Sequence, residues 1–278
     1  MSALGSAFGW LERFCHNYGP KIGRSTIVIV LLALWLPIVL VVVMSFAADG
    51  VLSFPPDNLT LEWYFVFLEN DAAISSVFTT MKVSLVATPI TVALATMLSY
   101  GVSRYDFRGK SAIQGLVTLP IIVPLIVVGV ALALFFGMIN VGGGFWSVVA
   151  AHVVRTIPFA ALIILPTFMT FDRSLEEASK DLGANELETF WNVTLPNIMP
   201  AIVAGGILAF TVSFNEFIYT YFVRGTGMET MPIYLWSRIQ HNVTPEVNVL
   251  SVVFLVVAIL LVLVAVLLTN ISRLTMRS

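Results

Sequence analysis

The chain has 278 residues, of which 58% are hydrophobic and only 11% are charged, and its mean hydropathy is +0.95. Soluble domains are about half apolar and a quarter charged, so this composition is typical of a membrane protein. The net charge of −2 excludes nucleic acid as the main partner. A single cysteine excludes an internal disulfide, and with three scattered histidines we expect neither a metal site nor another bound cofactor.

Six segments are long and apolar enough to cross about 30 Å of hydrocarbon as helices. We expect spans at 25–47, 74–102, 111–139, 145–171, 198–222 and 247–269, which form one membrane domain (25–269) between an arm (1–24) and a tail (270–278). Pro120 and Pro124 in the third span, and Pro158 and Pro166 in the fourth, are expected to bend their helices. The predicted fold is therefore an all-α polytopic membrane protein with six transmembrane helices.

The lysines and arginines predict the orientation of these spans. Ten of them lie in the arm, in the loops after the second and fourth spans, and in the tail, whereas the opposite loops hold two. Residues 48–73 contain five acidic side chains, Asp49 among them, and no basic one. Since basic residues stay on the cytoplasmic side, both termini are predicted to be cytoplasmic, Arg277 included, and 48–73 to lie outside.

The connection between the fourth and fifth spans, residues 172–197, is the one long loop on the predicted cytoplasmic side. It is polar, and its pattern predicts two short helices rather than a linker. Ser174 and Glu177 have the spacing of a capping box, which indicates the start of the first helix. Gly183 is the residue type that accepts a left-handed backbone, so we expect that helix to end there.

The second helix of the loop is expected to begin at Asn185 and Glu188, a further capping pair. It carries an apolar and aromatic side formed by Leu187, Phe190 and Trp191. Leu195 and Pro196 are expected to stop it and turn the chain into the fifth span. A rigid helical pair with an exposed aromatic side is suited to dock into a partner protein; a merely surface-lying amphipathic loop is the alternative.

The loop resembles the EAA loop of ABC importer permeases, whose pattern is EAA, three residues, G, nine residues, I, one residue, L, P. The matching positions are Glu177, Ala178, Ser179, Gly183, Val193, Leu195 and Pro196. Serine replaces the third position of EAA and valine replaces the isoleucine, and the spacing is kept throughout. This resemblance implies that 172–197 is a coupling helix, which enters a cleft of a cytoplasmic ATPase and passes its closure to the spans.

Other stretches resemble the spermidine/putrescine permease subfamily. These are Arg104–Lys110, Phe145–Ser147, Asp181–Ala184 and Pro245–Asn248. The subfamily implies a multi-pass protein of the bacterial inner membrane that works with a cytoplasmic ABC ATPase dimer, a second permease chain, expected to be a different one, and an extracytoplasmic solute-binding protein. The same resemblance implies that the solute is a polyamine.

The sequence lacks a nucleotide site of its own. A P-loop needs G-x-x-x-x-G-K-[ST], in which glycine amides surround the phosphates. Gly109, Lys110 and Ser111 supply only the end of that pattern, because Arg104 stands where the first glycine is required. We therefore expect a non-catalytic membrane subunit, with ATP hydrolysed by a separate chain.

Polar residues inside the predicted spans mark a candidate solute pathway, because a charge at the bilayer centre costs at least about 2.5 to 3.5 kcal/mol. Glu216 lies in the fifth span beside Asn215, at a position that aligns with a paired acidic position of the polyamine permeases. With aromatic neighbours such as Tyr219, it has the groups to hold an amine by charge and by cation–π contact. The alternative is that Glu216 belongs to a structural ion pair.

Arg155 in the fourth span points to a different solute. A guanidinium there would repel a polyamine and suits a carboxylate or phosphonate, unless Glu216 neutralises it. His152 lies one turn earlier, and we interpret it first as a packing residue and second as part of the pathway. An amino-acid-like, opine-like or phosphonate solute therefore stays open beside a polyamine.

Two other classes of protein compete with an ATP-driven importer. A secondary transporter would use Arg155 and Glu216 for ion coupling, but it leaves the EAA pattern unexplained. An intramembrane hydrolase would need a nucleophile and a base within the spans. The sequence has no G-x-S-x-G, no H-E-x-x-H and no intramembrane aspartate pair, so the importer is the leading hypothesis.

Overall fold

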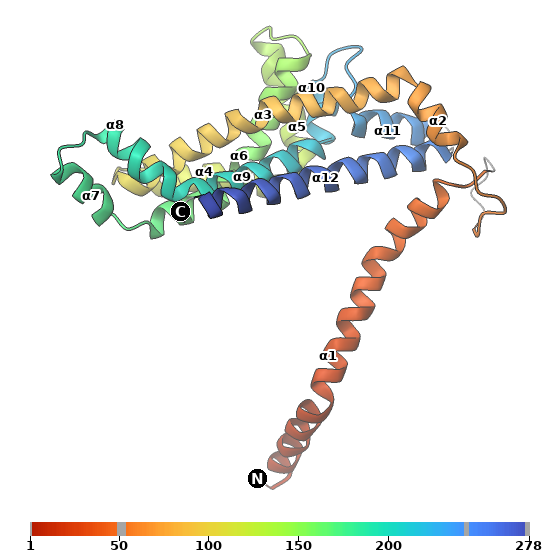
Figure 1. Ribbon diagram of the computed structural model, residues 1–278, viewed down its shortest axis with the longest axis horizontal. Helices are drawn as coiled ribbons and strands as arrows, with labels where there is room; N and C mark the ends of the chain where they lie inside the picture. The colour runs from red at the N-terminus through yellow and green to blue at the C-terminus, as the bar shows by residue number, and fades with distance from the viewer. Residues whose placement is uncertain (1, 49–53, 242–244, 276–278) are drawn as a thin grey trace. The chain divides into compact units, whose positions relative to one another are not determined.

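The computed structural model describes residues 2–48, 54–241 and 245–275, and Figure 1 shows it as a ribbon. Asp49 and Arg277, two of the charges used to predict the orientation, lie outside the described residues. The described chain is almost entirely helical; its one extended pairing is an isolated antiparallel bridge between Ala47 and Leu59. The chain divides into two compact units, Met1–Val66 with Thr244–Val252 and Phe67–Val243 with Val253–Ser278.

The first unit begins with helix α1, Ser2–Met44. Its apolar part, Gly23–Met44, matches the first predicted span, and the expected arm is helical and continuous with it. Beyond α1, the Ser45 hydroxyl lies 2.7 Å from the hydroxyl of Tyr64 in helix α2 (Glu62–Glu69). This contact and the bridge between Ala47 and Leu59 fold the chain back immediately after the span.

The second unit contains the remaining spans. Its helices are α3 (Asp71–Arg104), α4 (Lys110–Ile122), α5 (Leu125–Met138), α6 (Phe145–Thr170), α7 (Ser174–Asp181), α8 (Glu186–Thr189), π-helix η1 (Phe190–Thr194), α9 (Leu195–Phe214), α10 (Ile218–Val223), α11 (Met231–His241) and the later part of α12 (Pro245–Thr275). Helices α3, α6 and α9 pack against one another, and α10 packs against α5 and α6. Helices α7 and α8 lie at one end of this bundle (Figure 1).

Small residues make the contact between α3, α6 and α9 close. Ala95, Ala160 and Ala209 are fully buried there, and a Cβ on Gly205 would lie 3.1 Å from the Ile164 side chain. Lipid tails are as apolar as leucine, so membrane helices associate through such close packing and through hydrogen bonds between helices.

Five described helices are long and apolar enough to cross a membrane, and a sixth candidate is the bent pair α4 and α5. The prolines of the third predicted span explain its form. Pro120 stays inside α4, whereas Pro124 is the N-cap of α5, and the two helices meet at 108°. In the fourth span, Pro158 and Pro166 remain inside one continuous α6. The third span is therefore broken and not only curved, because Pro124 cannot continue the hydrogen-bond ladder of α4.

The glycines before α6 allow two chain segments to touch through their backbones. Gly143 lies against the loop after α10: a Cβ on it would come within 2.8 Å of the Arg224 carbonyl oxygen, and one on Gly225 would meet the Gly143 carbonyl. We expect Gly225→Ala to lower stability by about 1 to 3 kcal/mol, the usual cost of overpacking. Thermal unfolding in detergent measures this loss, with Gly142→Ala as the control, since a Cβ there meets nothing within 4 Å. Equal unfolding temperatures for the two variants would show that this contact is not tight.

Candidate functional site

The fifth predicted span, 198–222, is not one helix. Helix α9 ends at Phe214, three residues follow without helical structure, and α10 begins at Ile218. The Asn215 side chain donates to the Thr211 carbonyl at 2.8 Å, an oxygen that also accepts the Asn215 backbone N–H at 3.2 Å. Glu216 Oε1 accepts the backbone N–H of Tyr219 at 2.8 Å and so caps the start of α10. The prediction of a continuous helix was wrong because the Glu216 carboxylate, and not a backbone carbonyl, accepts the Tyr219 N–H at the break.

An ion pair forms at this break. Arg155 Nε of α6 lies 3.3 Å from Glu216 Oε2, with side chains 15% and 5% exposed. The guanidinium also lies 4.9 Å from the ring centre of Phe159 and 5.9 Å from that of Tyr219. The two charges that the sequence placed in separate spans therefore neutralise each other within one chain, as a buried pair in low dielectric requires.

His152 bridges the two sides of the break. Its Nδ1 lies 2.8 Å from the Ser213 hydroxyl, before the break, and its Nε2 lies 2.7 Å from the Thr220 hydroxyl, after it. The Ser213 hydroxyl in turn donates to Ser84 of α3 at 3.2 Å. Sequence reasoning missed Ser213 and Thr220. The available signal was their closeness to Glu216 along the chain, with Ser213 three residues before it and Thr220 four residues after it.

A cavity of about 340 Å³ opens beside the ion pair. Its lining contains three of the predicted pathway residues, Arg155, Asn215 and Glu216, together with Leu125 at the start of α5. Tyr219 and His152, also predicted for the pathway, are buried in the packed interior instead. Among the described residues, no group of three or more histidine, cysteine, aspartate or glutamate side chains is placed to hold a metal ion. The polar side chains that line the cavity are therefore one carboxylate, one guanidinium, one amide and the hydroxyl of Thr211.

The loop at the opposite end of α9 forms the two predicted helices, with one difference at its start. Ser174 does not cap α7; instead Asp172 Oδ1 accepts the Ser174 N–H at 3.0 Å. This hydrogen bond stabilises the carboxylate and lowers the pKa of Asp172 below its ordinary value. The predicted capping box at Ser174 and Glu177 was wrong, because Ser174 is already the first residue of the helix and the Glu177 N–H bonds to the Arg173 carbonyl.

The turn between the two helices follows the sequence pattern. Gly183 has a φ of +94°, the left-handed conformation that glycine accepts most readily. Asn185 Oδ1 accepts the Glu188 N–H at 2.9 Å, and Glu188 accepts the Asn185 N–H at 2.8 Å, so the predicted second capping box is confirmed.

The second helix does not stop at Leu195 and Pro196. It continues as α8, η1 and α9 from Glu186 to Phe214. Pro196 has no N–H to donate, and the preceding π-turn, in which Leu195 N–H bonds to the Phe190 carbonyl, accommodates it without a break. The second half of the loop is therefore continuous with the span that follows it.

The seven motif positions differ in their surroundings. Glu177, Ala178, Gly183 and Pro196 are exposed, whereas Ser179, Val193 and Leu195 are half-buried. The Ser179 hydroxyl lies 3.2 Å from that of Thr189, which joins α7 to α8. The outer surface of the loop also exposes Leu182 and Trp191. Exposed apolar side chains on two short helices are suited to a protein cleft.

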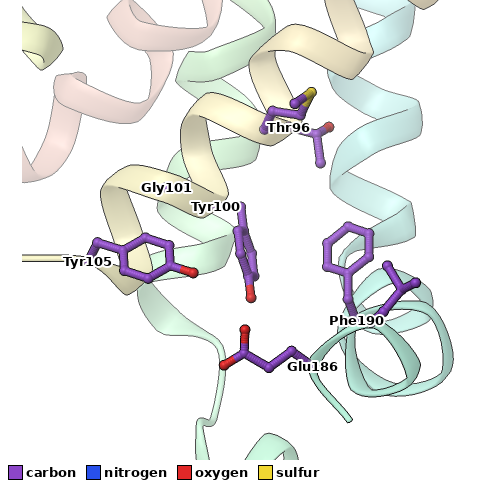
Figure 2. Close-up of a pocket in the computed structure, with 8 residues that line it drawn as sticks. Thr96, Tyr100, Gly101, Tyr105, Glu186 and Phe190 are labelled. Carbon is purple, nitrogen blue, oxygen red and sulfur yellow. The ribbon is translucent and has the colours of Figure 1, made fainter.

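Phe190 belongs to the inner side of the loop. Its ring meets that of Tyr100 in α3 edge to face, 5.4 Å between centroids. Both line a groove of about 600 Å³ between the end of α3 and the loop, together with Tyr105 and Glu186 (Figure 2). The aromatic side predicted as one docking surface is thus divided between outer Trp191 and inner Phe190.

The chain thus combines apolar helices, a buried charge pair at the break after α9, and a loop that is continuous with α9. The chain belongs to the family of binding-protein-dependent transport system inner membrane components, whose pattern matches residues 87–277. It is accordingly a multi-pass permease subunit of the ABC-transporter class in the inner membrane.

Relatives and a solved structure agree with this family. The chain is 32% identical over 238 residues to the spermidine/putrescine transport system permease protein PotC of Haemophilus influenzae, covering 85% of this chain and 92% of that one. It is 33% identical over 239 residues to the putrescine transport system permease protein PotI of Escherichia coli K12, covering 82% and 85%. A bacterial ABC transporter involved in the import of the acidic polysaccharide alginate has a similar fold, with a TM-score of 0.70, 16% identity, and coverage of 93% and 97%.

Proposed function

We propose that this chain is one of two permease subunits of an ATP-driven importer for a polyamine such as spermidine or putrescine. The observation that carries the solute class is Glu216, a carboxylate on a membrane-embedded cavity. The likeness to PotC and PotI, both polyamine permeases by name, supports the same class. An ammonium group would compete with Arg155 for Glu216 Oε2, while Oε1 stays bound to the Tyr219 N–H.

The coupling part of the proposal rests on the loop. Residues 172–197, which contain the EAA pattern, would dock into a cytoplasmic ATPase dimer, and a solute-binding protein would deliver the solute from outside. A second permease chain, expected to be a different one, would complete the pathway. The continuity of α8, η1 and α9 supports this role, because a displacement of the loop is passed directly to the span that ends beside Glu216. Both termini are proposed to be cytoplasmic, with 48–73 outside.

Arg155 supports a second solute class. It lines the same cavity and would pair with a carboxylate, so a carboxylated amine is the alternative. The fold leaves both open, since a chain of similar fold belongs to a transporter involved in the import of an acidic polysaccharide.

Reconstitution distinguishes the two classes. The chain is expressed with its genomic neighbours and placed in lipid vesicles, and ATP hydrolysis and uptake are measured with the binding protein loaded with spermidine, putrescine or a carboxylated amine. We expect stimulation and uptake with a polyamine. Stimulation by the carboxylated amine alone would mean that the solute is a carboxylated amine and not a polyamine. Uptake that follows an ion gradient without an ATPase would contradict the proposal of an ATP-driven importer.

A further inference from the structure

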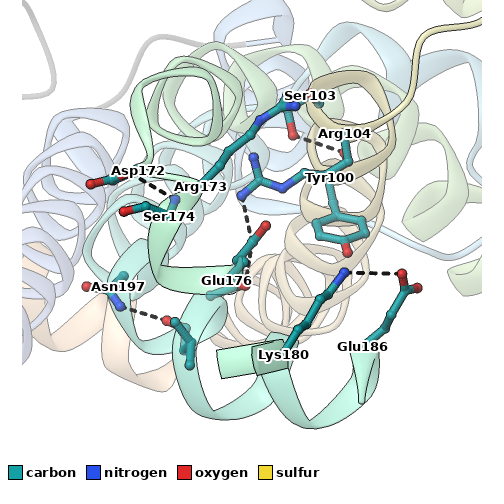
Figure 3. A network of polar contacts seen from close by, with 12 residues as sticks. Tyr100, Ser103, Arg104, Asp172, Arg173, Ser174, Glu176, Lys180, Glu186 and Asn197 are labelled. Atoms are coloured by element: carbon teal, nitrogen blue, oxygen red, sulfur yellow. Dashed lines mark hydrogen bonds and ion pairs between the residues drawn. The ribbon is translucent and has the colours of Figure 1, made fainter. Parts of the chain in front are cut away.

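A buried ion pair joins the coupling loop to a helix that is not its neighbour in sequence. Arg104 Nη2, in the last turn of α3, lies 2.7 Å from Glu176 Oε1 of α7, and the side chains are 9% and 14% exposed. Figure 3 shows Arg104 and Glu176 pointing toward each other. The same oxygen accepts the Thr194 hydroxyl of η1 at 2.6 Å. One carboxylate oxygen therefore connects α3, α7 and η1.

The surroundings of Arg104 make this connection specific. Its guanidinium lies 5.3 to 6.0 Å from the ring centres of Tyr100, Phe168 and Phe171. No hydrogen-bond acceptor among the described residues reaches its Nε or Nη1. A buried guanidinium is tolerated when it is paired, so this charge favours the loop position that presents Glu176 to it.

A second contact lies beside the first. Arg173 Nη2, just before α7, donates to the Ser103 carbonyl at 2.5 Å. Both contacts end on the last turn of α3, so the loop is attached there at two adjacent points. Glu176, Arg173 and Ser103 were not singled out from the sequence, and Arg104 was considered only within the stretch 104–110 and as the residue that breaks the P-loop pattern.

Helix α3 then extends from the loop to the polar groups at the break. Residues 84–104 span about 30 Å at 1.5 Å per residue. Along this length, Thr91 bonds to Thr156 of α6 at 2.7 Å, and Ser84 accepts from Ser213, the partner of His152. A continuous helix with hydrogen bonds at both ends can pass a displacement between them.

We propose that Glu176 is a positioning residue that carries the movement of the coupling loop into α3, so that two helices, α3 and α9, move the solute cavity together. The proposal rests on the proposed function, because the movement originates in the ATPase. Thr194 and Arg104 hold Glu176 in place. Without this link the loop would drive α9 alone, and ATP binding would change the cavity less.

The experiment follows the cavity itself. Asn215, which is exposed on the cavity, is changed to cysteine in a Cys15→Ser chain, so that the reporter is the one thiol of the chain. The whole complex in vesicles is labelled with N-ethylmaleimide, with and without ATP and vanadate. Glu176→Ala is compared with Thr194→Val, which removes one donor, and with Asp106→Asn, which breaks an exposed ion pair to Lys110 near the same end of α3.

We expect ATP and vanadate to change the labelling rate of the parent and of the Asp106→Asn variant by the same factor. In Glu176→Ala this factor should fall by roughly fivefold or more, the size of a typical coupling, and in Thr194→Val by less. Vanadate trapping of nucleotide by the ATPase should persist, which a merely misfolded loop would not allow. The proposal is overturned if both variants keep the full change in labelling rate on addition of ATP and vanadate. It is also overturned if Glu176→Ala prevents assembly with the ATPase while Thr194→Val has no effect. No response in the parent would instead contradict the proposed function.

Discussion

Replacing Gly183 by proline is expected to abolish ATP-dependent uptake. Gly183 has a φ of +94°, which the pyrrolidine ring forbids, and its N–H donates to the Lys180 carbonyl at 2.9 Å. The substitution costs about 3 kcal/mol or more, concentrated in the turn that sets α7 against α8. Uptake and stimulation of ATP hydrolysis by the loaded binding protein measure the effect.

Gly109 provides the matched control for this variant. It has nearly the same backbone conformation, with a φ of +96°, but it lies at the N-cap of α4, outside the coupling loop. Gly109→Pro should lower stability to a similar extent and leave substantial uptake in the complex that assembles. If the two variants lose uptake equally per assembled complex, the effect of Gly183→Pro comes from general instability, and the loop has no special part in coupling.

Removing Glu216 alone is expected to destabilise the protein far more than removing the whole ion pair. Glu216→Ala leaves the Arg155 guanidinium, 15% exposed, without its carboxylate, and breaking a buried pair costs about 3 to 5 kcal/mol. The double variant Arg155→Met with Glu216→Gln removes both charges and retains an acceptor for the Tyr219 N–H. Thermal unfolding should therefore show a large loss for the single variant and near-native stability for the double.

Uptake by the same variants tests whether the pair contacts the solute. If Glu216 binds an amine, the double variant should fold normally and still transport polyamine at least about tenfold more slowly, since the loss of a charged hydrogen bond is worth about 1.5 to 3 kcal/mol. Recovery of uptake together with stability would contradict the proposed solute role and leave the pair as a structural element. The single variant Arg155→Met tests the two charges separately, because it removes the guanidinium and leaves the Glu216 carboxylate free to bind a cation.

The sequence determined the membrane class, the approximate positions of the spans and the turn between the two short helices of the loop 172–197. Spans are recognised from length and apolarity alone, because backbone groups in lipid must be bonded within their own helix. Gly183, Asn185 and Glu188 form the predicted turn and capping box because their partners lie within a few residues along the chain. Local chemistry of this kind is complete in the sequence.

The tertiary structure decided where the fifth span breaks, which charges meet and which helix the loop holds. Glu216 caps α10 and also pairs with Arg155, 61 residues away; Glu176 meets Arg104, 72 residues away. An apolar pattern shows that a span is long enough but not which neighbour its few polar residues face. Those partners are selected only when the helices pack, because each buried charge is then stable only beside its opposite.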